Sequence, residues 1–188
     1  MKAFWITTLA LACVGSAIAQ DVPPPPPMRG DAATLQDTMK FIQDKLPGKV
    51  NYILYIHDNV TGIDGTLKGS LELTNVSADA GRCRIDDHWR MTQNGETRFD
   101  EDGWVDLRQV QEILVMPMDQ RQQQVRAKAG HPEQSVKVDP PVFVLILKRS
   151  DAIKESNFKF YDETLANRVA KALQHAVDLC GGGRQEPF

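Results

Sequence analysis

Apolar residues at helical spacing mark the first structured segment of the chain. In the stretch TLQDTMKFIQDKLPG, residues 34–48, apolar side chains recur every three or four positions until Pro47 and Gly48 interrupt them. This period predicts an amphipathic helix that ends at the proline and glycine. The residues on its apolar face are Leu35, Met39, Ile42 and Leu46.

From residue 49 to residue 160 the apolar positions instead alternate with polar ones, which is typical of half-buried strands. In RCRIDDHWRM, residues 82–91, one face is apolar except for Asp87, and the other face is charged. The apolar face holds Cys83, Ile85, Trp89 and Met91, and the charged face holds Arg82, Arg84, Asp86, His88 and Arg90. The pair Asn94-Gly95 follows and predicts a tight hairpin turn.

Two later segments depart from simple alternation. PVFVLILKR, residues 141–149, is apolar on both faces, which predicts a strand covered on both sides. RQQQVRAKAGHPEQSVKVDP, residues 121–140, is polar and ends in prolines, so we interpret it as an exposed loop with a short strand or helical turn at its start. The count is about seven strands with hairpin-style connections, which indicates an antiparallel sheet or barrel.

The last periodic segment is again helical. Asp162 is a favourable N-cap, and a wide apolar stripe runs from Leu165 to Cys180, where Gly181 is placed to end the helix. The alanines of the stripe (Ala166, Ala170 and Ala176) allow the helix to lie close to a sheet.

The order of these elements resembles the pleckstrin-homology-like (PH-like) fold over residues 50–181. In that fold a strongly bent antiparallel sheet forms a split barrel, and a C-terminal helix covers one open end. The ending FKFYDETLANRVAKALQHAVDLCGG also looks like the end of an uncharacterised family of exported bacterial proteins. The resemblance implies a C-terminal capping helix, and together with the N-terminal amphipathic helix predicted above the whole domain is expected to be α+β. The loop HDNVTGIDGT is acidic, so phosphoinositide binding is not implied.

The N-terminal region indicates export. Residues 1–19 combine Lys2, an apolar run and the Ala17-Ile18-Ala19 cleavage pattern of a signal peptide, and the run is too short to span a membrane. A lipoprotein anchor at Cys13 is the minor alternative. Residues 20–31 contain five consecutive prolines and are interpreted as a stiff tether. The predicted organisation is then a single domain over residues 32–181 and a flexible tail over residues 182–188, in a periplasmic or extracellular protein.

Charge and cysteine usage narrow the classes of function. Loss of Lys2 with the signal peptide leaves 21 basic against 25 acidic side chains, which argues against nucleic-acid binding. Two cysteines remain, Cys83 and Cys180, and an even count in an exported protein favours a disulfide between them. Two buried free thiols are the alternative.

No recognised catalytic, nucleotide-binding or metal-binding motif occurs in the sequence, so no enzyme activity, cofactor or metal is predicted. The charged face with Arg84, Asp86, His88 and Arg90 is a candidate ligand face that could hold a metal or an anion. Its alternative interpretation is a solvated face of cross-strand ion pairs.

Three hypotheses for function follow. The first is a non-enzymatic exported binding or scaffold module that engages a peptide or envelope protein through a groove or sheet edge. The second is a small-ligand carrier with a barrel cavity lined by Trp89, Trp104 and Phe143. The third is a metal-dependent enzyme or hydrolase that uses the Asp86 and His88 face. The sequence sets no oligomeric state.

Overall fold

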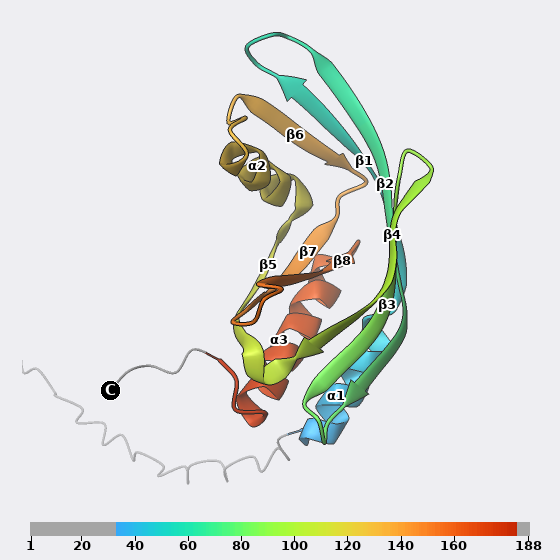
Figure 1. The fold of residues 1–188 in the computed structure, drawn as a ribbon, viewed down its shortest axis with the longest axis vertical. Coiled ribbons are helices and arrows are strands. Elements are labelled where there is room, and N and C mark those ends of the chain that lie inside the picture. The colour runs from blue at the N-terminus through green and yellow to red at the C-terminus, as the bar shows by residue number, and fades with distance from the viewer. Residues whose placement is uncertain (1–32, 184–188) are drawn as a thin grey trace, which may run out of the picture. The chain divides into compact units, whose positions relative to one another are not determined.

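The structure, a computed structural model, describes residues 33–183. This part of the chain is α+β, with three α-helices and two antiparallel sheets of five and three strands (Figure 1). The elements are α1 (Leu35–Lys45), β1 (Gly48–Asp58), β2 (Asp64–Asp79), β3 (Arg84–Gln93), β4 (Glu96–Asp106), a 3-10 turn η1 (Leu107–Gln109), β5 (Val110–Pro117), α2 (Met118–Lys128), β6 (Gln134–Asp139), β7 (Phe143–Arg149), β8 (Glu155–Phe160) and α3 (Glu163–Leu179). The predicted signal peptide and proline-rich tether, and residues 184–188 of the predicted tail, lie outside the described residues.

The predicted first helix is confirmed as α1. The Thr34 hydroxyl accepts a hydrogen bond from the backbone N–H of Asp37 and so caps the helix. Met39 and Ile42 are fully buried, and the helix packs against α3 and β2. Its apolar face therefore closes one end of the core.

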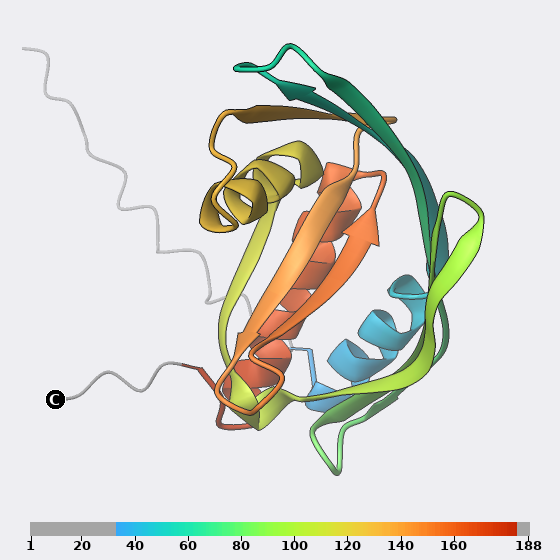
Figure 2. The same ribbon diagram turned by 45° about the horizontal axis from the view of Figure 1, so that its top comes forward.

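The larger sheet has the strand order β4-β3-β2-β1-β6 and curves around the rest of the described region (Figures 1 and 2). The predicted Asn94-Gly95 turn joins β3 to β4, and both residues have positive φ, at 51° and 85°. Such values fit the tight hairpin turns that match strand twist. The buried apolar residues of this sheet, among them Leu54, Leu73 and Ile85, face the two apolar cores.

The smaller sheet has the order β5-β7-β8 and separates two apolar cores. Leu145 and Leu147 of β7 pack into the core that contains α1 and α3. Val144 and Ile146 of the same strand pack into the other core, against β1 and β6. The prediction that this strand is covered on both sides is therefore confirmed.

The interpretation of residues 121–140 as an exposed loop was wrong for most of its length. Most of α2 lies there, followed by the strand β6. α2 is polar along almost its whole length and gives no apolar period; Met118 anchors its first turn, and Arg121 forms an ion pair with Glu155 of β8. β6 pairs with β1 and buries Val138, a contact that the short local pattern does not reveal.

The predicted C-terminal helix is confirmed as α3. The Asp162 carboxylate accepts from the N–H of Thr164, and the buried face packs on the smaller sheet and α1. Gly181 has a φ of 75°, as its predicted helix-ending role requires. Two residues of the predicted loose tail are held in place, because the backbone of Gly182 packs against Leu107 and the N–H of Gly183 donates to the Val110 carbonyl.

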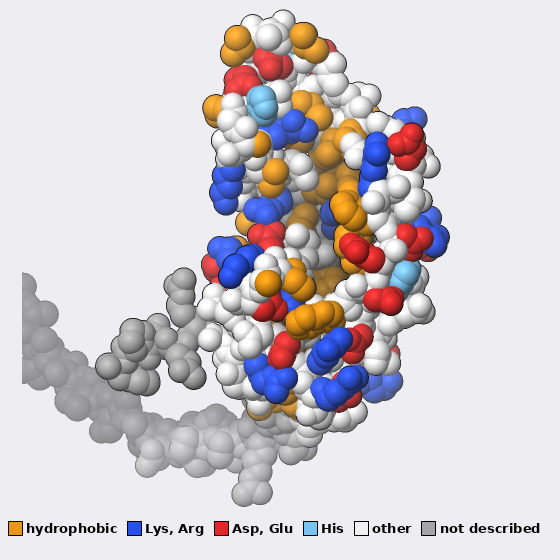
Figure 3. Space-filling model, in the orientation of Figure 1, with side chains coloured by type: hydrophobic (Ala, Val, Ile, Leu, Met, Phe, Trp, Pro, Cys, Tyr) orange, Lys and Arg blue, Asp and Glu red, His pale blue; other side chains and the backbone are white. Residues whose placement is uncertain are grey.

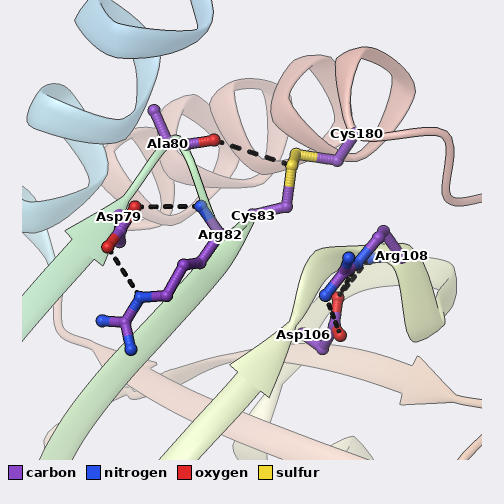
Figure 4. Close-up of a disulfide and its surroundings, with 7 residues drawn as sticks. All are labelled: Asp79, Ala80, Arg82, Cys83, Asp106, Arg108 and Cys180. Atoms are coloured by element: carbon purple, nitrogen blue, oxygen red, sulfur yellow. Dashed lines mark hydrogen bonds and ion pairs between the residues drawn. A yellow bond between two sulfur atoms is a disulfide. The ribbon is translucent and has the colours of Figure 1, made fainter.

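The predicted disulfide joins Cys83 to Cys180 and so ties the β2–β3 turn to the end of α3 (Figure 4). Cys83 was expected on the core face of a strand, but it is the last turn residue before β3, with a φ of 53°. The Asp79 carboxylate organises this turn by accepting from the backbone N–H and from Nε of Arg82. The turn, and not strand alternation, directs Cys83 toward α3.

The expected split barrel of about seven strands is not what residues 33–183 form. Eight strands are divided between two sheets that do not close into a barrel. The extra strand is β6, which was hidden in the predicted loop. The edge strand β8 of the smaller sheet does not pair with any strand of the larger sheet, so the two sheets are separate along β8.

Candidate functional site: a cleft between the two sheets

The two sheets leave a cleft between them along β8. Its volume is about 510 Å³, a size typical of small-molecule sites. Five consecutive residues of β8, 155–159, line it, so the free edge of this strand faces the cleft. Figure 3 shows the hollow between the sheets, with hydrophobic side chains along its floor and one wall.

The wall opposite β8 is the concave face of the larger sheet. Leu71 and Leu73 of β2 lie beside their cross-strand partners Met91 and Trp89 of β3. The Trp89 ring also packs against Phe99 of β4, with ring centroids 5.3 Å apart. The alternation of these strands therefore gives the cleft a continuous apolar surface.

Asp87 interrupts this apolar wall. Its side chain is only 8% exposed and lies over Gly103, its cross-strand partner on β4. A Cβ atom at residue 103 would collide with the Asp87 carboxyl group, so glycine makes room for it. Burial raises the pKa of Asp87 to about 6, and the negative charges of Asp86 and Asp102 add to the rise.

Lys159 reaches into the cleft from β8. Its side chain is mostly buried, and its ammonium lies 5.4 Å from the centre of the Tyr52 ring. Among the described residues, the ammonium has no hydrogen bond and no ion pair. Burial lowers its pKa to about 8.

Tyr52 is positioned by a second cross-strand glycine. Its partner in the β1–β2 register is Gly69, and a Cβ atom there would lie 2.5 Å from the tyrosine ring. Tyr52 can lie flat against the sheet only because residue 69 has no side chain. The same arrangement thus recurs at Tyr52 and at Asp87.

Arg149 closes the end of the cleft away from Lys159. Its side chain is fully buried, pairs with Asp151, and donates to the Trp104 carbonyl oxygen at 2.8 Å and the Ser156 hydroxyl at 3.0 Å. Its guanidinium carbon also lies 4.8 Å from the centre of the Trp104 ring. Ser156, which accepts from Arg149, lies three residues before Lys159 on β8. The basic groups of Arg149 and Lys159 are therefore about 10 Å apart along the strand.

The candidate ligand face predicted from the sequence lies on the other side of the larger sheet and consists of ion pairs. Arg84 contacts Asp86, and Arg90 contacts Asp100 of β4 at 2.9 Å. Both ring nitrogens of His88 are engaged, with Asp102 and Asp100 at 2.8 Å each. These hydrogen bonds, first to Asp102 and then to Asp100, raise the pKa of His88. The structure brings the four predicted residues together along β3 but leaves none of them lining the cleft.

Of the three aromatic residues expected to line a cavity, two line the cleft and one does not. Trp89 and Trp104 both contribute to the cleft, whereas Phe143 packs against the core beside α3. Sequence reasoning missed Lys159 and Arg149 as site residues. Each is a basic residue beside an apolar stretch of its strand, a common pattern that does not indicate burial or a site. Asp87 did leave a signal, since it is the one charged residue on an otherwise apolar strand face.

A second depression lies on the outward face near the far end of the β1–β2 hairpin. It has a volume of about 630 Å³ but is more open, and its lining includes the solvent-exposed Tyr55, His57 and Lys137. Neither His57 nor Lys137 is withdrawn from water as Lys159 is. The cleft between the sheets is therefore the better candidate for a site.

Two kinds of feature are absent from residues 33–183. No group of three or more histidine, cysteine, aspartate or glutamate side chains there is arranged to hold a metal ion. No helix in the same range has the length and apolar character needed to cross a membrane. Comparisons with known protein families, curated proteins and solved structures found no match.

Proposed function

We propose that this protein is an exported, non-enzymatic binding module that carries a small apolar or amphipathic ligand in the cleft between its two sheets. The observation that carries the proposal is the cleft itself, with its volume of about 510 Å³ and its apolar wall. The sequence predicted a cavity inside a barrel, whereas the proposed site is an open cleft between two separate sheets.

Mostly buried ionisable groups support a binding role for the cleft. A space left by imperfect packing would be lined by apolar side chains, whereas this one contains Lys159 and Asp87, both with shifted pKa values. Perturbed ionisable groups in a cleft are characteristic of functional sites. Within the described part of the cleft they form no hydrogen-bonded pair of nucleophile and base, which favours binding over catalysis.

Export and the PH-like architecture belong to the same proposal. The Cys83–Cys180 disulfide supports an oxidising compartment. The order of a four-strand meander, a second sheet and a C-terminal helix supports a PH-like relationship. In this proposal the proline-rich segment tethers the binding domain to its surroundings.

A fluorescent neutral ligand tests the proposal. N-phenyl-1-naphthylamine, added to the full chain, is expected to bind saturably at one site, with competition by 1-dodecanol. Leu71→Asp places a charge on the apolar wall and is expected to reduce this binding at least about tenfold, because a carboxylate there replaces apolar contact surface for a neutral ligand.

The matched control is Lys68→Asp, which puts the same carboxylate on β2 but at an exposed position. It is expected to leave binding within about twofold of the parent chain. Absence of saturable binding, or equal effects of the two folded variants, would refute the cleft as the ligand site.

A second candidate is a peptide that adds as a strand to β8. It is favoured by the run of five consecutive β8 residues along the cleft, because an unpaired strand edge offers backbone hydrogen bonds. Native mass spectrometry of the protein isolated from cells that express it distinguishes the two. A bound mass of a few hundred daltons that is not a peptide supports the carrier, and a bound peptide supports strand addition.

A further inference from the structure

Lys159 carries a charge for which the described part of the protein offers no anionic partner. Arg149, the other basic group of the cleft, is matched by Asp151, and Glu155 on β8 is matched by Arg121 of α2. Lys159 has only the face of the Tyr52 ring, at 5.4 Å. The positive charge of Lys159 thus has no counter-charge in contact with it within residues 33–183.

Burying an unpaired ammonium is unfavourable, so this arrangement needs a compensating partner. A ligand with an anionic group would supply that partner and would form charge-assisted hydrogen bonds with the ammonium. The ammonium lies next to the apolar wall, which begins with Leu71 beyond Gly69 on β2. An anionic head at Lys159 would therefore leave an attached apolar body against Leu71, Met91 and Trp89.

The charge count selects the kind of head group. A single unmatched positive charge fits a singly charged carboxylate better than a doubly charged phosphate. At the opposite end, Asp87 is held mostly out of water, and Glu101 lines the cleft beside Trp89. These carboxyl groups disfavour a second negative charge on the distant part of the ligand.

We infer that Lys159 is the head-group-binding residue of the cleft and that the ligand is an apolar molecule with one carboxylate at its end. This inference rests on the proposed function of the cleft as a carrier site. It adds the chemical class of the ligand and its orientation, with the carboxylate at Lys159 and the apolar body along β2 and β3.

Matched ligands of equal chain length test the inference. Dodecanoate, 1-dodecanol and dodecylammonium are titrated into the full chain, with displacement of N-phenyl-1-naphthylamine as the readout. Dodecanoate is expected to bind about 10- to 100-fold more tightly than 1-dodecanol, because a hydrogen bond between two charged groups is stronger than one to a neutral hydroxyl. Dodecylammonium is expected to bind most weakly.

Lys159→Met keeps the length and apolar stem of the side chain and removes its charge. It is expected to abolish the preference for dodecanoate over 1-dodecanol. Lys159→Arg retains the charge and should keep part of the preference. Lys68→Met, at the exposed position on β2, should leave the preference unchanged.

The outcomes separate the two proposals. If none of the three ligands binds, both the carrier function and the inference fail. If dodecanoate and 1-dodecanol bind equally, or if Lys159→Met keeps the preference for dodecanoate, the cleft remains a carrier site and the inference about Lys159 is overturned. Because Lys159→Met removes a desolvated charge, the variant is expected to fold, which denaturant unfolding checks.

Discussion

Asp87 and Lys159 occupy positions where packing alone would favour apolar residues. Each lies in the cleft, and burial favours the neutral form of each side chain. It raises the pKa of Asp87 to about 6 and lowers the pKa of Lys159 to about 8. Glycines on neighbouring strands accommodate Asp87 directly, and Lys159 through Tyr52. The sequence hinted at Asp87 through the broken alternation of β3, but Lys159 acquires its environment only when β8 faces β1.

The Asp87 carboxyl group should make stability fall as pH rises. Its folded-state pKa of about 6 lies above the usual value near 3.9, so between about pH 4 and 6 the folded state keeps a proton that the unfolded state has lost. Asp87→Asn should therefore stabilise the protein at pH 7, by at most about 3 kcal/mol, and have little effect at pH 4. Denaturant unfolding at the two pH values measures the difference.

The control for this prediction is Asp44→Asn, which changes an exposed carboxylate on α1 that pairs with Lys40. Its effect is expected to stay within about 0.5 kcal/mol at both pH values. An equal effect of Asp87→Asn at pH 4 and pH 7 would show that burial of the charge is not the cause.

At the scale of elements, local pattern was sufficient where one face of an element is buried. α1, β7 and α3 each carry a clear apolar period and N-cap or strand signal, and all three were predicted. α2 was missed because polar contacts hold most of it, and β6 was missed because its alternation is short and its pairing is with the distant β1. Arg126 of α2 donates to the Gln134 side chain of β6, and such contacts leave no periodic signal in the sequence.

The pairing of β1 with β2 depends on a missing side chain. In Gly69→Ala, the added Cβ would lie 2.5 Å from the Tyr52 ring, so the ring or the strand must move. We expect a loss of about 1–3 kcal/mol in the free energy of unfolding, as for other overpacked positions.

Gly65→Ala is the matched control on the same strand, because its nearest neighbour, Cβ of Ile56, is 4.0 Å away. It should change stability by less than about 0.5 kcal/mol. Equal stabilities of the two variants would contradict the close packing of Tyr52 on residue 69.

At the scale of the whole described domain, the disulfide connects elements that are far apart in sequence. Cys83 and Cys180 are separated by 97 positions and join the β2–β3 turn to the end of α3. Together with α1, which packs between α3 and β2, the bond fixes the smaller sheet and its helix to one end of the larger sheet. The second apolar core joins the smaller sheet to β1 and β6, and the cleft lies between these contacts along the free edge of β8.

Removing the disulfide tests this connection. The double variant Cys83→Ala/Cys180→Ala should unfold with a free energy lower by about 4–5 kcal/mol, the loop-closure contribution for a closed loop of this length. Denaturant unfolding in the absence of reductant provides the measurement, and added reductant should lower the stability of the parent chain but not of the variant. Titration that finds two free thiols in the denatured, unreduced parent chain would contradict the bond.

The sequence by itself determined the elements with strong apolar periods, the antiparallel class of the strands and the pairing of the two cysteines. These features depend on local spacing and on the number of cysteines in the expected mature chain. Tertiary structure alone decided that the strands form two separate sheets, that β8 keeps a free edge, and that Lys159 lies unpaired opposite an apolar wall. The reason is that each of these depends on which distant residues come together, and a period of two or of 3.6 residues records only which face of an element is buried.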